Sequence, residues 1–539
     1  MARYFLGIDV GTGSARTGVF NESGDLLSSA KQPIAIWHEA GGVVEQSSED
    51  IWRAVSGTVR QAVADAGIDP ALIAGIGFDA TCSLVAVGRG GAPISLSRSG
   101  DPDRNIIVWM DHRAVAEADE INGGEHAVLR YVGGRISPEM ETPKLLWLKR
   151  HLPEQYRAAT HFFDLSDYLT WRATGSLARS VCTVTCKWTY LAHEGRWDAD
   201  YFRAIGLEDL AADEFRRIGT DIVAPGVALG TGLSVEAAAE LALPVGTPVG
   251  AALIDAHAGG IGTLGAGEIE TEPSSDIGRR LAYIFGTSAC SMATTGQPTF
   301  VDGVWGPYFS AMVPGLWLNE GGQSAAGAAI DYLVRMHPAA GAIEARAKAE
   351  GLSLVGYLER AAARAGDGVA DLADGIVVVP EFLGNRAPFA DPDARALIAG
   401  LTLDESEDSL VALYVAGLAG LGCGLRQLLD ALADKAIDID LIMASGGAAN
   451  SPLVLQMIAD STATEVASVT SPEPVLLGAA MLGAVAGGHY PDLSSAMAVM
   501  SRIAKVYRPV SGALRDKHDR RYQAFKLLQE TGRRLREMV

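Results

Sequence analysis

Two short turns of the same composition, about half a chain apart, constrain the fold of this sequence most. The first, Gly11-Thr-Gly-Ser14, follows an apolar segment that ends at Asp9, and the second is Phe285-Gly-Thr-Ser288. Glycines let a backbone approach phosphates, and Thr and Ser hydroxyls and amides donate hydrogen bonds to them. Two such turns on two lobes would hold a nucleoside triphosphate, with Asp9 holding magnesium through water. Taken singly, each turn is equally well interpreted as an ordinary hairpin.

Two commoner nucleotide-binding motifs are absent. A dinucleotide-binding turn needs a third glycine at the position that Arg16 occupies, and a P-loop needs a Gly-Lys pair, which the chain lacks. The sequence therefore argues against a hydride-transferring dehydrogenase and against a P-loop enzyme.

Length, composition and charge limit the classes of protein to which this sequence can belong. The chain has 539 residues, of which 48% are hydrophobic and 20% charged, so we expect two large domains and little disorder. The formal net charge is -21, and basic residues gather only near the C-terminal end. Nucleic acid is therefore not expected as a partner.

Neither a membrane span nor a metal or disulfide framework is expected. The start of the chain reaches Asp9 too soon for a signal peptide, and the uncharged runs 409–425 and 474–490 are predicted to be buried helices. Five cysteines do not indicate a disulfide framework, and Cys182 and Cys186 lack the further ligands of a zinc site. We expect a cytoplasmic protein with no membrane partner, and the sequence leaves a homodimer open.

The first part of the chain predicts a mixed sheet with helices outside it. Strands are expected at residues 4–9, 15–21, 26–33 and 73–79, and apolar residues at helical spacing predict a helix over 48–66. Residues 109–210 are irregular and rich in tryptophan. Each tryptophan singly is expected in the core, although as a group they would also suit a sugar pocket.

The second part repeats this organisation. A strand over 244–254 is expected to end at Asp255 and to lead into a glycine-rich turn. The second lobe begins near residue 281, with helices predicted at 324–336, 407–433, 451–460 and 475–485 and a strand at 441–444. Both lobes run from a glycine turn through strands to strand-to-helix turns, which predicts a distant internal duplication of architecture.

As a set, these motifs resemble the FGGY family of carbohydrate kinases. The anchors are residues 7–14, 253–257, 285–288 and 445–450, in this order. Among family members the chain looks most like the ribulokinases, and Asp79-Ala-Thr-Cys-Ser-Leu-Val85 resembles the segment typical of D-ribulose kinases. The resemblance implies a two-lobed α/β fold of the actin/hexokinase/Hsp70-like (ribonuclease H-like) type with a central cleft. We expect domains at 1–265 and 266–510, and a C-terminal helix over 511–539.

The resemblance also implies roles for particular residues. Asp255 would be the catalytic base, and Asp9 and Asp255 would lie near magnesium. The nucleotide would meet Gly11, Thr12, Gly13, Ser14 and Arg16 in the first lobe, Gly286, Thr287 and Ser288 in the second, and Gly446, Gly447 and Asn450 around adenosine. The sugar would meet Ala80, Thr81, Lys187, Asp255 and Glu320, with Asp111 and His112 either contacting it or supporting the pocket.

The residues themselves fit these roles but leave alternatives. Asp255 follows an apolar strand, where ligands usually bind in such sheets, yet an isolated helix N-cap is an equal interpretation. Lys187 alone is also compatible with a surface charge, and His112 with a structural role. Asp111 is the better choice for a hydroxyl contact, because carboxylates accept hydrogen bonds from sugar hydroxyls.

The expected function is ATP-dependent phosphorylation of a pentulose, D-ribulose to D-ribulose 5-phosphate, with ATP and Mg²⁺ as cofactors. Phosphoryl transfer needs an aligned hydroxyl, a metal and donors around the moving group, which these motifs supply. Another sugar or polyol kinase, acting on L-ribulose, D-xylulose, ribitol or glycerol, stays open. So does an actin/Hsp70-like regulatory ATPase, although the tryptophan-rich segment with its polar residues argues against it.

Overall fold

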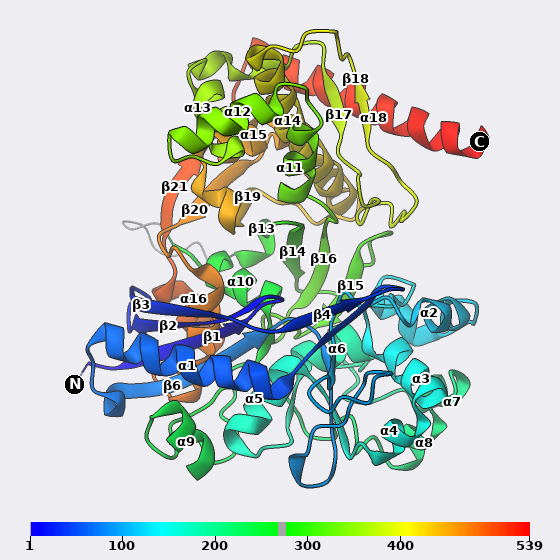
Figure 1. Ribbon diagram of the computed structural model, residues 1–539, viewed down its shortest axis with the longest axis vertical. Helices are drawn as coiled ribbons and strands as arrows, with labels where there is room; N and C mark the ends of the chain where they lie inside the picture. The colour runs from blue at the N-terminus through cyan, green and yellow to red at the C-terminus, as the bar shows by residue number, and fades with distance from the viewer. Residues whose placement is uncertain (1, 268–275, 539) are drawn as a thin grey trace.

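The computed structural model describes residues 2–267 and 276–538, which form two lobes stacked one above the other (Figure 1). The first lobe is built on a sheet with the order β12-β6-β1-β2-β3. Its strands are β1 (Tyr4–Val10), β2 (Ser14–Asn21), β3 (Leu26–Pro33), β6 (Ile73–Ala80) and β12 (Leu253–Ile254). The strands predicted in this region are confirmed, except that the strand expected over 244–254 is reduced to its last two residues, β12. Val249 still forms a bridge to Ile76 of β6, but the backbone of Ala251 bonds to residues 226 and 227 instead, which interrupts the ladder before β12.

The second lobe repeats the topology of the first. Its larger sheet has the order β15-β16-β14-β13-β19-β20-β21. The strands are β13 (Arg280–Phe285), β14 (Ala289–Thr295), β15 (Trp305–Phe309), β16 (Trp317–Gln323), β19 (Leu441–Ser445), β20 (Glu465–Val469) and β21 (Ile503–Tyr507). β1 pairs antiparallel with β2 and parallel with β6, and β13 likewise pairs antiparallel with β14 and parallel with β19. The predicted internal duplication of architecture is confirmed.

Helix α1 (Ser48–Ala66) forms where its capping residues and apolar spacing predict a helix. Ser47 caps its start by accepting a hydrogen bond from the Asp50 amide, and the left-handed Gly67 ends it. Ile51 and Val55 recur on one face and are fully buried against the first sheet. The helix therefore has the predicted bounds.

Two helices cross between the lobes where these meet: α10 (Asp255–Leu264) and α16 (Pro474–Ala486) (Figure 1). α16 follows the second-lobe strands in sequence but lies on the first sheet, where a Cβ added to Gly77 would sit 1.8 Å from the carbonyl oxygen of Ala479. α10 packs in turn against β13, and a Cβ on Gly259 would sit 2.9 Å from Ile284. Each domain thus lends one helix to the sheet of the other.

The glycine-rich turn predicted after Asp255 is wrong, because these glycines lie inside α10. A Cβ on Gly262 would sit 2.0 Å from the carbonyl oxygen of Pro474, and a Cβ on Gly478 would sit 1.9 Å from that of Ala258. The glycines of α10 and α16 therefore let two helix backbones touch. The helix predicted at 475–485 is confirmed as α16.

The second lobe covers its sheet with helices and carries the C-terminal helix. α14 (Glu407–Ala433) has the predicted bounds and is long and apolar enough to cross a membrane, but 78% of its most apolar window is buried in the protein, as predicted for a buried helix. The helix predicted at 324–336 is α11 (Gly327–Arg335), that at 451–460 is α15 (Pro452–Thr462), and the C-terminal helix is α18 (Ala513–Met538). α18 packs on the hairpin of β17 (Val377–Val379) and β18 (Leu397–Ala399).

The tryptophan-rich middle segment forms helices beside a small antiparallel sheet, β4-β5-β8-β7-β9. Trp147 and Trp188 are buried in the hydrophobic core, as expected for single tryptophans. The sheet strands are β4 (Ile36–Glu39), β5 (Val43–Gln46), β7 (Leu84–Val87), β8 (Ile106–Ile107) and β9 (His161–Asp164). The helices are α2 (Val115–Asn122), α3 (Glu141–His151), α4 (Pro153–Ala158), α5 (Leu165–Thr174), α6 (Val181–Trp188), α7 (Ala199–Ala204) and α8 (Glu208–Ala212). The remaining helices are α9 (Val235–Leu241), α12 (Ala340–Ala349), α13 (Leu354–Ala363) and α17 (Leu493–Met500).

Candidate active site

Three carboxylates meet at one edge of the first sheet. Asp9 of β1 pairs in register with Asp79 of β6, and β12, whose Leu253 also pairs with Asp79, leads directly into Asp255. Because β1, β6 and β12 run parallel, their carboxyl ends bring these acids together. Asp255 is the first residue of α10 rather than its N-cap, and one of its carboxylate oxygens accepts a hydrogen bond from the Ala256 amide at 2.7 Å.

The environment of the three acids differs. Arg16 pairs with Asp9 at 2.5 Å and, on its other side, with Glu473 at 2.8 Å. Asp79 is fully buried, and neither of its oxygens has a hydrogen-bond partner in the described part of the chain. Burial, together with Asp9, raises the pKa of Asp79 well above its usual range. Burial and Asp9 also raise the pKa of Asp255, to about 6, so that it remains mostly ionised at neutral pH.

Each of the two predicted phosphate turns is closed by a backbone hydrogen bond from its first glycine, although the first turn is one residue longer. The Gly11 amide donates to the Ser14 carbonyl at 3.1 Å, and the Gly286 amide donates to the Ser288 carbonyl at 2.9 Å. Trp109 donates its indole N–H to the Thr12 hydroxyl at 3.1 Å, which fixes the first turn. The second turn is held by the start of α11, since the amides of residues 326 and 328 donate to the Thr287 carbonyl.

The residues predicted around adenosine follow β19. Gly446 has a φ of 89°, and an added Cβ would sit 2.5 Å from the carbonyl oxygen of Phe285. Only glycine fits there, because the strand end and the second phosphate turn touch backbone to backbone. Gly446, Gly447 and Asn450 are exposed and adjoin this turn.

Lys187 and Glu320, predicted as sugar contacts, approach each other from different lobes. Lys187 lies on α6 and Glu320 on β16, and both side chains are buried. Burial opposes the charge on Lys187, but neighbouring acidic groups, Glu320 among them, raise its pKa well above the usual range. Burial would raise the pKa of Glu320, yet the contact with His257 and the Lys187 charge hold it at about 2. Both groups are therefore charged at neutral pH.

An aromatic ring that sequence reasoning missed lies beside this pair. The Lys187 ammonium is 5.4 Å from the ring centre of Trp305, and the Arg386 guanidinium is 5.6 Å from the same ring. Trp305 is also the strand neighbour of Glu320. Arg386 lies in the segment Gly384-Asn-Arg386, which resembles ribulokinases, but the resemblance assigns it no role. Trp305 has no sequence signal that separates it from a core tryptophan.

Ala80 and Thr81 close β6 at the same edge. Both are buried, the Thr81 amide donates to the carbonyl of Val10 at 3.0 Å, and its hydroxyl contacts that of Ser83 at 3.2 Å. These bonds tie the segment after β6 to the end of β1, beside the acids.

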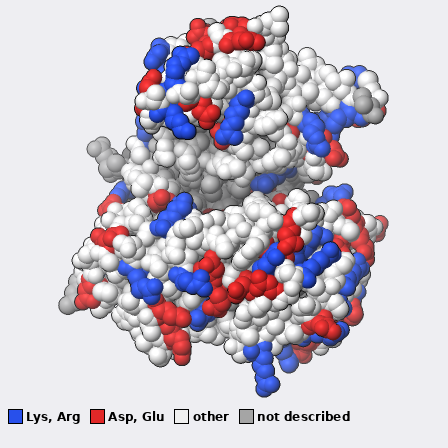
Figure 2. Space-filling view, viewed as in Figure 1, with Lys and Arg blue, Asp and Glu red and all other residues white. Residues whose placement is uncertain are grey.

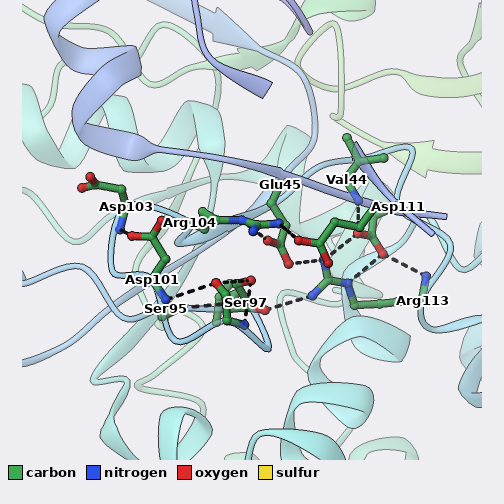
Figure 3. A network of polar contacts seen from close by, with 12 residues as sticks. Val44, Glu45, Ser95, Ser97, Asp101, Asp103, Arg104, Asp111 and Arg113 are labelled. Carbon is green, nitrogen blue, oxygen red and sulfur yellow. Dashed lines mark hydrogen bonds and ion pairs between the residues drawn. The ribbon is translucent and has the colours of Figure 1, made fainter. Parts of the chain in front are cut away.

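Asp111 is held by a structural network of polar contacts (Figure 3). One carboxylate oxygen accepts hydrogen bonds from the Val44 amide at 2.6 Å and from Arg113 at 2.7 Å, and the other accepts two from Arg113 at 2.9 Å. Arg113 also pairs with Glu45. Because both oxygens are engaged by the protein, the network favours the supporting role for Asp111 over a hydroxyl contact. His112 is half-exposed, and its ring lies 3.8 Å from Glu139, whose contact raises the pKa of the imidazole.

The space-filling view shows a hollow between the lobes, lined on this face mainly by uncharged residues (Figure 2). This arrangement is typical of a two-lobed phosphotransferase that acts on a polar small molecule: acids lie at a strand edge, two Gly-Thr-Ser turns lie on separate lobes, and a buried lysine and glutamate lie between them.

Comparison with known proteins identifies the particular family. Residues 4–262 and 281–487 match the N- and C-terminal domains of the FGGY family of carbohydrate kinases, so the chain belongs to this family and is an ATP-dependent carbohydrate kinase. It is 45% identical over 536 residues to a human FGGY carbohydrate kinase domain-containing protein, covering 98% of this chain and 96% of that one. It is 38% identical over 519 residues to a D-ribulokinase of Saccharomyces cerevisiae, covering 91% and 72% of the two chains. The fold matches a xylulose kinase of Lactobacillus acidophilus with a TM-score of 0.79, at 20% identity over 98% of both chains.

The acidic edge suits a magnesium ion that binds mainly through substrate phosphates. No group of three ligating side chains within residues 2–267 and 276–538 is placed to enclose a metal ion. Mg²⁺ is usually held by one or two carboxylates plus phosphate oxygens and waters, and the carboxylates of Asp9 and Asp255 lie near each other at this edge. The residues present therefore fit a magnesium–nucleotide complex better than a free metal.

Proposed function

We propose that this kinase phosphorylates a pentulose, D-ribulose, at its terminal 5-hydroxyl. The observation that carries the proposal is the 38% identity to a D-ribulokinase over 91% of the chain. Two features of the chain support it: the segment 79–85, which ends β6 beside the acids, and the charged pair of Lys187 and Glu320. A lysine that donates and a glutamate that accepts suit a substrate with several hydroxyls.

In this proposal Asp255 accepts the proton of the attacking hydroxyl. Its pKa of about 6 lies close to neutral pH, where a general base works best. Lys187 and Glu320 orient the sugar, and Ala80 and Thr81 close the pocket. The turns at Gly11–Ser14 and Gly286–Ser288 donate to the triphosphate, with Gly446, Gly447 and Asn450 beside adenosine.

Asp9 and Asp255 would hold magnesium, which neutralises phosphate charge when bound. Arg16 keeps Asp9 in place through their ion pair. Because the two turns belong to different lobes, we also propose that the lobes close on the bound substrates, which would keep water from the phosphoryl group. We place the enzyme in the cytoplasm.

The test is a coupled assay of ADP release with D-ribulose, L-ribulose, D-xylulose, ribitol and glycerol. We expect the highest kcat/KM with D-ribulose, and NMR of the product should place the phosphate on the 5-oxygen. A buried polar group left unpaired by an inverted hydroxyl costs about 1–3 kcal/mol, roughly 5- to 150-fold. A tenfold preference for L-ribulose or D-xylulose would overturn the sugar assignment. ADP release that no sugar accelerates would favour the regulatory ATPase.

A further inference from the structure

A buried chain of three side chains runs behind the catalytic edge. The thiol of Cys182 on α6 lies 3.0 Å from Nδ1 of His257, and Nε2 of His257 lies 3.4 Å from Oε2 of Glu320. All three side chains are buried. These three side chains connect α6, α10 and β16 of the second lobe. α6 also carries Lys187, and α10 begins at Asp255.

The order of these groups fixes where the imidazole proton lies. In either protonation state of the cysteine–histidine contact, Nε2 carries a proton that it donates to Glu320. When the Cys182 thiol donates to Nδ1, the one ring proton must be on Nε2, and when that proton has passed to Nδ1, both ring nitrogens carry one. The reverse tautomer would place an Nε2 lone pair against the Glu320 carboxylate, which is repulsive. The Ile254 amide also approaches the Cys182 sulfur at 3.5 Å, so the thiol is held by the residue next to Asp255.

The contacts among Cys182, His257 and Glu320 leave one oxygen of Glu320 free for substrate. Oε2 faces His257, whereas in the described ranges no hydrogen bond engages Oε1. A glutamate side chain has three rotatable bonds, and fixing one of its oxygens restricts the position of the other. The position of Oε1 is therefore restricted, because Oε2 of the same carboxylate is already held by His257.

We propose that His257 is a positioning residue: held by Cys182, it presents a proton to Glu320 and fixes the carboxylate that receives a sugar hydroxyl. The inference rests on the proposed sugar contact of Glu320. His257 itself touches neither the sugar nor the phosphates in this assignment.

The decisive variants separate the two contacts of the ring. His257→Leu removes both. His257→Gln keeps a donor near the Nε2 position and can still reach Glu320, whereas His257→Asn keeps a group near Nδ1 and can reach only Cys182. Hydrogen bonds to charged groups contribute enough for a loss of roughly 10- to 150-fold. We expect His257→Leu to lower kcat/KM for the sugar by about tenfold or more, mainly through KM, while KM for ATP stays unchanged.

Rescue distinguishes positioning from simple packing. We expect His257→Gln to recover most of the sugar affinity and His257→Asn to recover little, and Cys182→Ser to outperform Cys182→Ala. His518→Leu is the matched control, because it changes another buried histidine, on α18. It should alter stability but leave KM for the sugar unchanged. If His257→Leu does not fold, the comparison of Gln with Asn decides alone.

Three results with the His257 variants would overturn the inference: a folded His257→Leu enzyme with wild-type KM for the sugar, an equal rise in KM for the sugar and for ATP, or a His257→Gln enzyme that binds the sugar no better than His257→Asn. The assay uses whichever carbohydrate the wild-type enzyme phosphorylates fastest, so a wrong sugar in the proposed function does not affect it. Glu320→Gln is measured beside these variants. If it leaves KM for the sugar unchanged, Glu320 is not a sugar contact, and the role given to His257 falls while the kinase assignment stands.

Discussion

In the first lobe, β1 and β6 end beside Asp9 and Asp79, which pair in register. In the second lobe the matching strands, β13 and β19, pair Ile284 with Ser445 and lead into glycines. The order β12-β6-β1-β2-β3 of the first sheet matches β20-β19-β13-β14-β16 of the second in order and direction, and the second sheet adds β15 and β21 at its edges. One copy therefore presents carboxylates that can take a proton or a metal, and the other presents amides and hydroxyls that can donate to phosphate. The comparison teaches that one scaffold, present twice, offers different chemical groups when the residues at its strand ends differ.

The largest expected effect comes from the acidic strand ends. Asp255→Asn should fold and bind ATP but lower kcat by about 10²–10⁴-fold, because a general base is removed. A control at a strand end of the other lobe, Ser445→Ala, removes a buried hydroxyl that has no hydrogen-bond partner in the described residues and should leave kcat close to wild type. Steady-state ADP release measures both. An Asn variant with more than about a tenth of wild-type turnover would show that Asp255 is not the base.

The next effect tests the donor side of the comparison. Gly446→Val should raise KM for ATP by roughly 5- to 150-fold, since a side chain at this positive φ costs about 1–3 kcal/mol and would clash with the Phe285 carbonyl. KM for the sugar should change little. Gly296→Ala is the control, because its Cβ would enter open space and the residue has no place in the proposed nucleotide site. Equal ATP affinity in the two variants would contradict a nucleotide site at this loop.

The crossed helices predict a change in stability that both lobes share. Gly478→Ala should lower the free energy of unfolding by about 1–3 kcal/mol or more, because its Cβ would collide with the Ala258 carbonyl. Gly341→Ala, on α12 with open space around it, should instead stabilise by about 0.5–1 kcal/mol. Urea unfolding measures both. If the two substitutions had the same sign, the close approach of α10 and α16 would be refuted.

The smallest effect is an opposite response of the lobes to acid. In the second lobe, burial and nearby arginines lower the pKa of His518 to about 4, below its unfolded value of about 6.5. As the pH falls from 6.5 towards 4, only the unfolded state gains the proton, so this group makes folding less favourable. In the first lobe, burial raises the pKa of Glu141 to about 7, above its unfolded value of about 4.3, although Lys144 opposes the shift. As the pH falls from 7 towards 4.3, the folded state gains this proton, and stability rises.

Urea midpoints at pH 7.5 and pH 5 test the two signs. Each group contributes at most about 1.4 kcal/mol per pH unit. His518→Gln should lose less stability on acidification than the wild-type enzyme, and Glu141→Gln should lose more. Parallel pH profiles of the three proteins would show that neither group is perturbed in this way.

Sequence alone was sufficient wherever the determining residues are neighbours in the chain. α1 and α14 have the predicted bounds, because caps and apolar spacing are local. The turns at residues 11–14 and 286–288 and the acid after β12 lie where the sequence predicts them for the same reason, while their roles stay predictions. The ion pair between Asp111 and Arg113 is equally local, since the two residues are two positions apart. No periodic pattern in the sequence predicts it, however.

The rest depends on residues that only the tertiary fold brings together. Cys182, His257 and Glu320 are separated by 75 and 63 positions along the chain, and no motif joins them. Trp305 and Arg386 meet through a ring contact between distant segments. The glycines after Asp255 were interpreted as a turn, because the helix that presses on them, α16, comes more than two hundred residues later. Local secondary-structure propensity contains no information about a packing partner that lies so far away in the sequence.

The position of α16 also bears on how the protein emerges from the ribosome. The strands of the first sheet are complete once β12 has been made, but one face of that sheet lies bare until the chain has been extended to Ala486. At about 5–20 residues per second, the intervening stretch takes roughly 10–45 s to synthesise. During that time the backbone at Gly7, Gly75 and Gly77 has no covering helix. A nascent chain of this enzyme therefore exposes an apolar sheet surface until α16 has been synthesised. That is the interval in which a chaperone would be needed.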